Sequence, residues 1–287
     1  MIQYKQHLDI PLEYIREKIS AFLLEDMPEG DVTTYSIISK SKKIIANIQA
    51  VEELIFAGEK IIPYCFEDDC NIKLYKSDGD LVKPKESIGE IQGPASIILS
   101  NERVMLNLIQ RLCGIASTAF EYVQLAHNTN VKILDTRKTS PGLRLFEKYA
   151  VAVGGAYNHR LDLSDGILIK DNHIVSAGSV KKAIQSVKKT YPNLPLEIEV
   201  DTLKQIKEAL IIGVDGFLLD NMNTEAVKES VEIIRNSKNG YKIFIEASGG
   251  IVKNNIKKYL DTGINAISIG AITHSVKNKD IRLEFIS

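Results

Sequence analysis

The pattern of apolar and polar positions changes near residue 130. Beyond that point, short runs rich in Leu and β-branched residues alternate with amphipathic stretches at helical spacing. The runs are VKILDT (131–136), GILIK (166–170), LEIEV (196–200), GFLLD (216–220), KIFIEA (242–247) and AISIG (266–270). The stretches between them include residues 178–191, 202–213, 223–237 and 252–263. Near-continuous apolar strands that alternate with helices predict a parallel sheet covered by helices.

Two architectures satisfy this alternation, an open doubly wound sheet and a (β/α) barrel. A nucleotide-binding doubly wound sheet carries a GxGxxG motif after its first strand, and this chain has none there. Polar or charged residues instead follow nearly every run, as expected where a barrel assembles its active site from the C-terminal ends of its strands. The pattern therefore favours an incomplete, TIM-like α/β barrel, because only six runs are clear.

The first part of the chain mixes element types. Residues 12–24 have apolar positions at helical spacing, and strand-like runs broken by Gly, Asp and Pro follow from 44 to 93. Residues 97–127 contain no proline and predict one or two helices with a break near Gly114. We therefore expect an α+β domain over 1–115 and a barrel domain over 116–274, with the C-terminal tail 275–287 as a candidate to pack on the first.

Composition and charge exclude several classes of protein. The 36 Lys and Arg nearly balance the 37 Asp and Glu, and a formal net charge of −1 argues against a general nucleic-acid binder. Cys65, Cys70 and Cys113 have no metal-type spacing, so reduced thiols are expected. The N-terminus has no apolar leader, and no run has the length of a membrane span. A cytoplasmic globular protein without a membrane partner is expected.

A group of cations surrounds the first two runs of the C-terminal half. Arg137 and Lys138 follow the first run, and Arg160 and Lys170 flank the second. A solvated loop explains any one of them alone. Because strand ends meet on one face of a barrel, the set would repel itself without an anionic ligand. Arg forks suit carboxylate or phosphate, so the sequence predicts an anion pocket.

Acidic residues and glycines end the later runs. Glu199 and Asp220 close the third and fourth runs, and Glu246 lies near the end of the fifth. Such carboxylates either pair with the cations or hold Mg²⁺ and sugar hydroxyls. The segments 248–250 (SGG) and 268–274 (SIGAITH) follow the last two runs, where glycine lets backbone N–H groups approach a phosphate. The expected ligands are a metal-bound phosphorylated sugar and a small polycarboxylate.

Sequence blocks along almost the whole chain point to one family. They are EDMPEGDVTT (25–34), NERVMLN (101–107), GIAS (114–117), DTRKTSPGLRLFEKYAVAVGG (135–155), NHRLDLSD (158–165), LIKDNH (168–173), EVD (199–201), LDNM (219–222), EASGGI (246–251) and ISIGAITHS (267–275). Together they resemble the quinolinate phosphoribosyltransferases, also called nicotinate-nucleotide pyrophosphorylases. The resemblance implies an N-terminal open-faced α+β sandwich, an incomplete α/β barrel, and a homo-oligomer, either a dimer or a hexamer of dimers.

The resemblance also implies an activity and its residues. The family transfers the phosphoribosyl group of 5-phosphoribosyl 1-diphosphate to quinolinate with Mg²⁺, giving nicotinate mononucleotide, diphosphate and CO₂ in de novo NAD synthesis. Substrate binding would fall to Arg103 from the neighbouring subunit and to Thr136, Arg137, His159, Arg160 and Lys170. The catalytic residues would be Lys138, Lys170, Glu199 and Asp220, the last two holding the metal directly or through water or substrate. The 5′-phosphate would lie against Ser248, Gly249, Gly250, Gly270 and His274.

Three departures and three alternatives accompany this resemblance. The departures from the usual family residues are Cys113, Ala156 and Asp201. A molybdenum-transport-associated paralogue of the same fold is expected to lack Lys170 and Arg144, which this chain has.

The other two alternatives use the same scaffold differently. A Schiff-base aldolase would need an apolar surrounding for Lys170, whereas Asp171 and His173 adjoin it. A non-catalytic ligand-binding homologue is expected to have lost some of the cations and acids of the pocket, and this chain keeps them.

Overall fold

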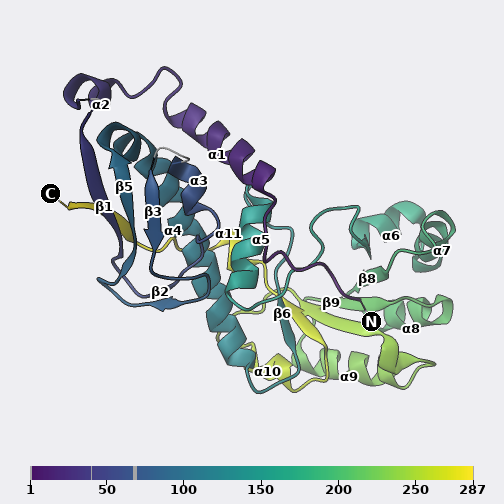
Figure 1. The fold of residues 1–287 in the computed structure, drawn as a ribbon. Helices are drawn as coiled ribbons and strands as arrows, with labels where there is room; N and C mark the ends of the chain where they lie inside the picture. Colours follow the sequence, from purple (N-terminus) through teal and green to yellow (C-terminus); the bar gives the residue numbers. More distant parts are fainter. Residues whose placement is uncertain (1, 40, 67–69, 287) are drawn as a thin grey trace. The chain divides into compact units, whose positions relative to one another are not determined.

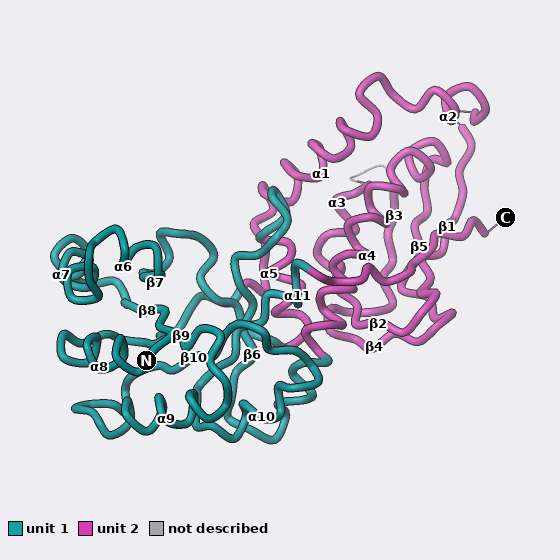
Figure 2. Tube along the Cα trace, turned by 180° about the vertical axis from the view of Figure 1, so that it is seen from behind, with its two compact units in different colours: residues 1–6, 121–144, 156–274 teal, residues 7–120, 145–155, 275–287 magenta. Residues whose placement is uncertain are grey.

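The computed structural model describes residues 2–39, 41–66 and 70–286 (Figure 1). They form two compact units, neither of which is continuous in sequence (Figure 2). The first unit comprises residues 1–6, 121–144 and 156–274, and the second comprises 7–120, 145–155 and 275–287. Among the described residues, no helix is both long and apolar enough to cross a membrane.

The first unit is built on a six-stranded parallel sheet with the order β6-β11-β10-β9-β8-β7. Its strands are β6 (Lys132–Leu134), β7 (Ile167–Ile169), β8 (Leu196–Val200), β9 (Gly216–Asp220), β10 (Phe244–Ser248) and β11 (Ala266–Ser268). Successive strands are neighbours, and the last one returns to pair with the first. Because β6 and β7 lie at the two ends of this order, the sheet is a barrel with one gap. The predicted incomplete α/β barrel is confirmed.

Helices follow the barrel strands. They are α6 (Asp171–Ala177), α7 (Val180–Thr190), α8 (Leu203–Ile212), α9 (Thr224–Arg235), α10 (Lys257–Leu260) and α11 (Ala271–His274), and a short 3₁₀ turn, Gly240–Lys242, precedes β10. Helices α7, α8 and α9 pack one against the next outside the sheet (Figure 1). Each begins at a side-chain cap, since Ser179, Thr202 and Asn223 accept backbone N–H bonds in the first turn. These polar residues set where the helices start.

The helix expected over 252–263 is shorter than predicted, because only α10 forms there. The Asn255 side chain accepts from the Val252 N–H at 2.8 Å and donates to the Gly250 carbonyl at 2.9 Å. This local bonding favours a turn over the first helical residues.

The second unit contains a four-stranded antiparallel sheet with the order β12-β1-β5-β3. Its strands are β1 (Lys43–Ala50), β3 (Asn71–Leu74), β5 (Ser87–Pro94) and β12 (Ile281–Ile286), and β2 (Leu54–Ile55) pairs with β4 (Leu81–Val82). Its helices are α1 (Leu12–Asp26), α2 (Val32–Ile37), α3 (Ile62–Phe66), α4 (Ala95–Ala126, which ends in the first unit) and α5 (Arg144–Val153). In β1 the buried Ala46, Ile48 and Ala50 alternate with more exposed residues, so one face of the sheet carries core.

Helix α4 occupies almost the whole of the proline-free segment 97–127. It is a single helix through Gly114, where a break was expected. A Cβ on Gly114 would lie 2.4 Å from the carbonyl oxygen of Lys277, so the glycine admits the C-terminal segment against the helix. The tail 275–287 belongs to the second unit, where β12 pairs with β1.

The compact units also differ from the predicted division at 115. The change of unit falls at Phe120, because α4 runs through 115 without interruption. Two short segments belong to the unit of the other half of the chain: residues 1–6 join the barrel unit, and residues 145–155, which include most of α5, join the second unit. Neither assignment could be seen from hydrophobic periodicity.

Gly114→Ala is expected to destabilise the protein, because an added methyl overlaps the Lys277 carbonyl and overpacking costs about 1–3 kcal/mol. Alanine returns about 1 kcal/mol in a helix interior, so a net loss of about 1–2 kcal/mol is expected for this backbone overlap. Urea unfolding measures the difference. Gln124→Ala, at an exposed position of the same helix, is the control and should change stability by less than about 0.5 kcal/mol. Equal stability of the two variants would contradict the close approach of the tail.

Candidate active site

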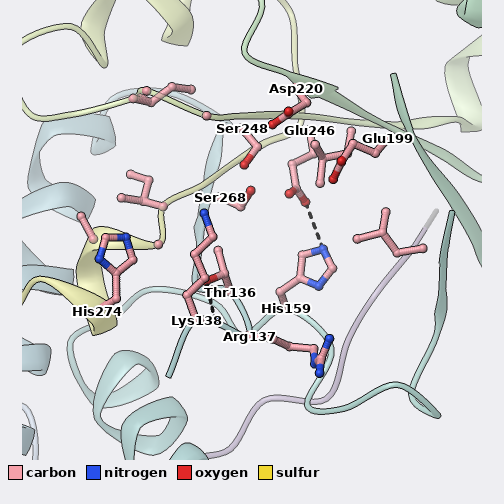
Figure 3. A pocket seen from close by; sticks show the side chains of 18 of the residues that line it. Thr136, Arg137, Lys138, His159, Glu199, Asp220, Glu246, Ser248, Ser268 and His274 are labelled. Atoms are coloured by element: carbon pink, nitrogen blue, oxygen red, sulfur yellow. Dashed lines mark hydrogen bonds and ion pairs between the residues drawn. The ribbon is translucent and has the colours of Figure 1, made fainter. Parts of the chain in front are cut away.

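A cavity of about 500 Å³ opens at the C-terminal ends of the barrel strands (Figure 3). It brings together almost all of the site residues predicted from sequence. They are Thr136, Arg137, Lys138, His159, Arg160, Lys170, Glu199, Asp220, Ser248, Gly249, Gly250, Gly270 and His274. The remaining predicted residue, Arg103, is exposed on α4 in the second unit.

The cations line one part of the cavity wall. Arg137 and Lys138 follow β6, and the backbone N–H of Lys138 donates to Oγ1 of Thr136 at 3.0 Å. Arg160 is 6% exposed, and its Nη1 donates to the carbonyl of Gly166 at 2.8 Å. Burial lowers the pKa of the Arg160 guanidinium, and the charge of Arg137 lowers it further. The cations are therefore held close enough to repel, which an anionic ligand would relieve.

Two acids stand at the ends of the adjacent strands. Glu199 at the end of β8 forms an ion pair with the ammonium of Lys170. Asp220 ends β9 opposite Ser248 of β10, and its Oδ2 accepts from the Asn221 side chain at 2.7 Å. Carboxylate oxygens of this kind are the ligands that Mg²⁺ takes beside substrate phosphates. The donor set of Glu199 and Asp220 therefore suits this ion.

The glycine loops bring backbone to the cavity surface. Gly249 has φ +86°, and a Cβ there would lie 2.3 Å from Oδ1 of Asn221, so no other residue suits this position. A Cβ on Gly270 would lie 2.9 Å from the His274 ring and 3.0 Å from Cδ of Lys138. Both glycines thus let neighbouring side chains pack directly against the loop backbone at the cavity surface.

A buried cluster lies below these groups. Among the described residues, His159, Glu197 and Glu246 are the group of three whose imidazole and carboxylate atoms all lie within 4.8 Å of one another. Nε2 of His159 lies 3.5 Å from a carboxylate oxygen of each acid, and its Nδ1 accepts the backbone N–H of Arg160 at 2.8 Å. Burial raises the pKa of Glu246 to about 7, and Glu197 adds to the rise. A proton on Glu246 limits the negative charge beneath an anion pocket.

Asp135 holds the segment that carries His159. Its Oδ1 accepts the His159 backbone N–H at 2.7 Å, and its Oδ2 accepts from the Asn158 side chain at 2.8 Å. Tyr157 bridges to Leu134, so this segment extends along the free side of β6. The Asp of the DTRK block is therefore a buried positioning group for the NHR block.

Sequence reasoning missed Glu197 of the buried cluster and Tyr4, which contacts it. Glu197 carried a usable signal, since strand residues two apart share a face and Glu199 was already assigned to the site. The hydroxyl of Tyr4 donates to Glu197 at 3.2 Å across 193 residues of sequence, and no local pattern reports such a contact.

Comparison with known proteins gives one consistent result. Residues 31–113 match the N-terminal domain of quinolinate phosphoribosyl transferase, and residues 115–284 match its C-terminal domain. A probable nicotinate-nucleotide pyrophosphorylase [carboxylating] of Bacillus subtilis is 42% identical over 274 residues, covering 94% of this chain and 93% of that protein. A quinolinate phosphoribosyltransferase [decarboxylating] of Nicotiana tabacum is 38% identical over 96% of this chain and 83% of its own length.

Solved structures agree with these sequence relatives. The nicotinate-nucleotide pyrophosphorylase of Francisella tularensis superposes with a TM-score of 0.90 at 34% identity, covering 99% of this chain and 100% of that one. The likeness extends over both units.

Glu246→Gln is expected to make stability less dependent on pH. The pKa of Glu246 rises from 4.5 to about 7 on folding, so its contribution to stability is present below about pH 4.5 and is lost as pH rises through about 7. Relative to the wild type, the variant should gain about 2 kcal/mol between about pH 5 and pH 8, measured by urea unfolding. Glu229→Gln, at an exposed position of α9, is the control. Parallel pH profiles for wild type and Glu246→Gln would show that Glu246 does not carry the shifted proton.

Proposed function

The chain belongs to the quinolinate phosphoribosyltransferase family, and we propose on this basis that it transfers the phosphoribosyl group of 5-phosphoribosyl 1-diphosphate to quinolinate with loss of CO₂. The products are nicotinate mononucleotide and diphosphate, so the reaction is a pentosyl transfer of de novo NAD synthesis. The observation that carries this function is that the cations, acids and glycine loops predicted from sequence line one cavity.

The cation wall provides for the pyridine dicarboxylate. Arg137, Arg160 and Lys170 line the cavity and supply positive charge for two carboxylates. The Thr136 hydroxyl and the His159 ring complete this wall. Neutral or singly charged acceptors would leave part of this charge uncompensated, so the wall favours a dianion.

The opposite wall provides for the sugar phosphate. The 5′-phosphate would lie against Ser248, Gly249, Gly250, Gly270 and His274. Lys138 follows β6 beside Gly270 and would meet the diphosphate or ribose. Glu199 and Asp220 would hold Mg²⁺ and the ribose hydroxyls, and that ion would supply charge stabilisation for the departing diphosphate.

The cations of this chain would serve the reaction at two points, the departure of the diphosphate and the loss of CO₂. Lys138 and the other cations stabilise the negative charge that develops on the leaving diphosphate, while the pyridine nitrogen attacks the anomeric carbon. The bond from C2 to its carboxylate then breaks, CO₂ leaves, and the electron pair stays at C2 beside the cationic ring nitrogen until a proton replaces it. The cations around the ring favour this carbanion.

The alternatives have less support from the site. Lys170 forms an ion pair with Glu199, and this charged surrounding does not suit a Schiff-base nucleophile. Arg144 is also in place, with its Nε donating to Thr139 at 3.0 Å, so both residues expected to be absent from the transport-associated paralogue are present.

The oligomer and location belong to the same proposal. Arg103 is exposed on α4, as a residue offered to a neighbouring subunit of a dimer or a hexamer of dimers would be. Burial raises the pKa of the Cys65 and Cys113 thiols to about 12, which suits structural thiols in a reducing cytoplasm. The expected partners are the two small substrates, without nucleic acid or membrane.

The substrate assignment predicts a specific assay result. Quinolinate absorbance should fall only when 5-phosphoribosyl 1-diphosphate and Mg²⁺ are both added, and nicotinate should not serve as acceptor. Lys170→Ala and Arg137→Ala should each lower kcat/KM by about 10²-fold or more, because each removes charge stabilisation. Lys181→Ala, at an exposed position of α7, is the control. A folded Lys170→Ala or Arg137→Ala variant with a near-normal rate would refute the assignment.

A shared active site predicts complementation between inactive variants. Arg103→Ala and Lys170→Ala should each be inactive alone. Mixed subunits would contain one intact composite site in each heterodimer, so random mixing should restore about a quarter of the wild-type activity. Refolding the two variants together and measuring turnover provides the test. No recovery, or full activity of Arg103→Ala alone, would contradict a role for Arg103 across an interface.

A further inference from the structure

The first residues of the chain fill the interior of the incomplete barrel. Ile2 is buried with Leu134 of β6, Phe244 of β10 and Ala266 of β11, and Tyr4 packs against this cluster. Each of these three strand residues lies two positions before a residue that lines the cavity, so their side chains share its face, one layer deeper. The N-terminal segment therefore supplies core beneath the cavity.

Hydrogen bonds hold this segment in place. The side-chain oxygen of Gln6 accepts the backbone N–H of Asn158 at 2.8 Å, and its Nε2 donates to the Asn158 carbonyl at 3.3 Å. A Cβ on Gly166 would lie 3.1 Å from Cε1 of Tyr4, so the glycine before β7 leaves room for the aromatic ring. The segment thus lies against both chain portions that border the barrel gap, near Asn158 and near Gly166.

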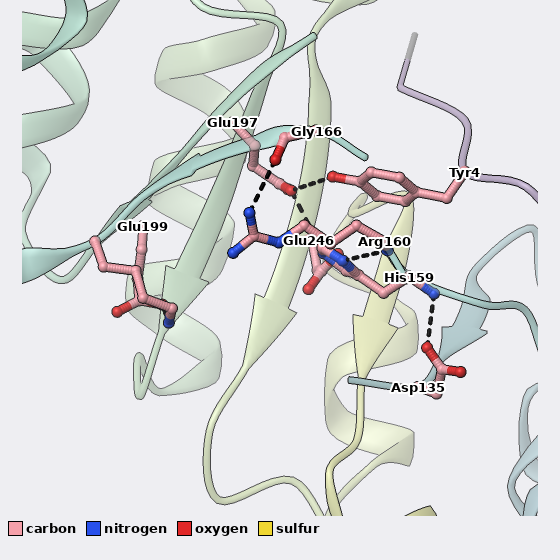
Figure 4. Close-up of polar contacts among 9 residues, drawn as sticks. Tyr4, Asp135, His159, Arg160, Gly166, Glu197, Glu199 and Glu246 are labelled. Atoms are coloured by element: carbon pink, nitrogen blue, oxygen red, sulfur yellow. Dashed lines mark hydrogen bonds and ion pairs between the residues drawn. The ribbon is translucent and has the colours of Figure 1, made fainter. Parts of the chain in front are cut away.

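Tyr4 contacts the floor of the cavity in two ways (Figure 4). Its ring stacks on the imidazole of His159, with centroids 4.4 Å apart and an interplanar angle of 26°. Its hydroxyl donates to Oε2 of Glu197 at 3.2 Å. Burial raises the pKa of Tyr4, and the charges of Glu197 and Glu246 raise it further, so the hydroxyl remains a donor.

The position of the imidazole is linked to the cation wall. Nδ1 of His159 accepts the backbone N–H of Arg160, whose side chain is held by the Gly166 carbonyl. Nε2 faces Glu197 and Glu246. With one ring face on Tyr4, Nδ1 accepting a hydrogen bond and Nε2 at 3.5 Å from both carboxylates, the imidazole is held between the buried acids and the adjoining arginine.

We propose that Tyr4 is a positioning residue for the dicarboxylate site: it holds His159 over Glu197 and Glu246, and so keeps His159 and Arg160 in place in the cavity wall. This inference rests on the proposed function. Without the Tyr4 ring, the His159 imidazole can turn, and the backbone N–H of Arg160 then loses a fixed acceptor. Without the hydroxyl, Glu197 loses a donor and its charge is less well compensated beneath an anionic substrate. Both losses act on the acceptor and leave the sugar phosphate side unchanged.

Steady-state kinetics with both substrates test the proposal. Tyr4→Ala should raise KM for quinolinate about tenfold, the order expected for one stacked ring and one charge-assisted hydrogen bond. Its kcat and its KM for 5-phosphoribosyl 1-diphosphate should stay within about twofold of wild type. Tyr4→Phe keeps the ring and loses the hydroxyl, so its KM for quinolinate should rise about threefold. Tyr191→Ala, an exposed tyrosine of the same unit, is the control.

The order alanine above phenylalanine above wild type in KM for quinolinate supports the proposal. An unchanged KM for quinolinate in either variant, or an equal rise in KM for both substrates, overturns it. If Tyr4→Ala does not fold, Tyr4→Phe decides alone by the same criterion. Failure of the proposed function is distinguishable, because the wild type itself would then not consume quinolinate.

Discussion

The structure depends on holding like charges together at the ends of parallel strands. Arg137, Arg160 and Lys170 converge on one cavity, although Arg160 is almost fully buried. Glu199 in the same cavity pairs with Lys170, whereas burial raises the pKa of the deeper Glu246 to about 7 and so limits its negative charge. The formal net charge of −1 therefore hides a local segregation of charge. That segregation lets a neutral protein select small, multiply charged substrates without attracting polyanions.

The gap in the barrel creates a second requirement, which the chain meets with irregular segments. Residues 157–160 extend along β6 and are pinned by Asp135, while Arg160 reaches the carbonyl of Gly166 just before β7. The N-terminal segment fills the interior below them. The same residues that close the gap carry cavity side chains, so packing and substrate binding are coupled on this side of the barrel.

Much of the fold could be predicted because strand runs and helical spacing are local signals, and the polar strand ends identified nearly the whole cavity. The missed elements lacked such signals. Helix α5 buries Glu147 and Lys148 along with its apolar residues, which obscures its periodicity. The sequence around Gly114 does not indicate that the carbonyl of Lys277, distant in sequence, lies where a side chain at position 114 would be. Tyr4 contacts Glu197 and His159 only in the folded chain, so no local sequence pattern indicates either contact.

Release of CO₂ from quinolinate labelled at its 2-carboxylate is the most direct measurement of what the cation cavity does. Purified protein with 5-phosphoribosyl 1-diphosphate and Mg²⁺ should release labelled CO₂, diphosphate and nicotinate mononucleotide in equal amounts. Diphosphate formation without labelled CO₂, or turnover with nicotinate but not with quinolinate, would contradict a site built for a pyridine dicarboxylate.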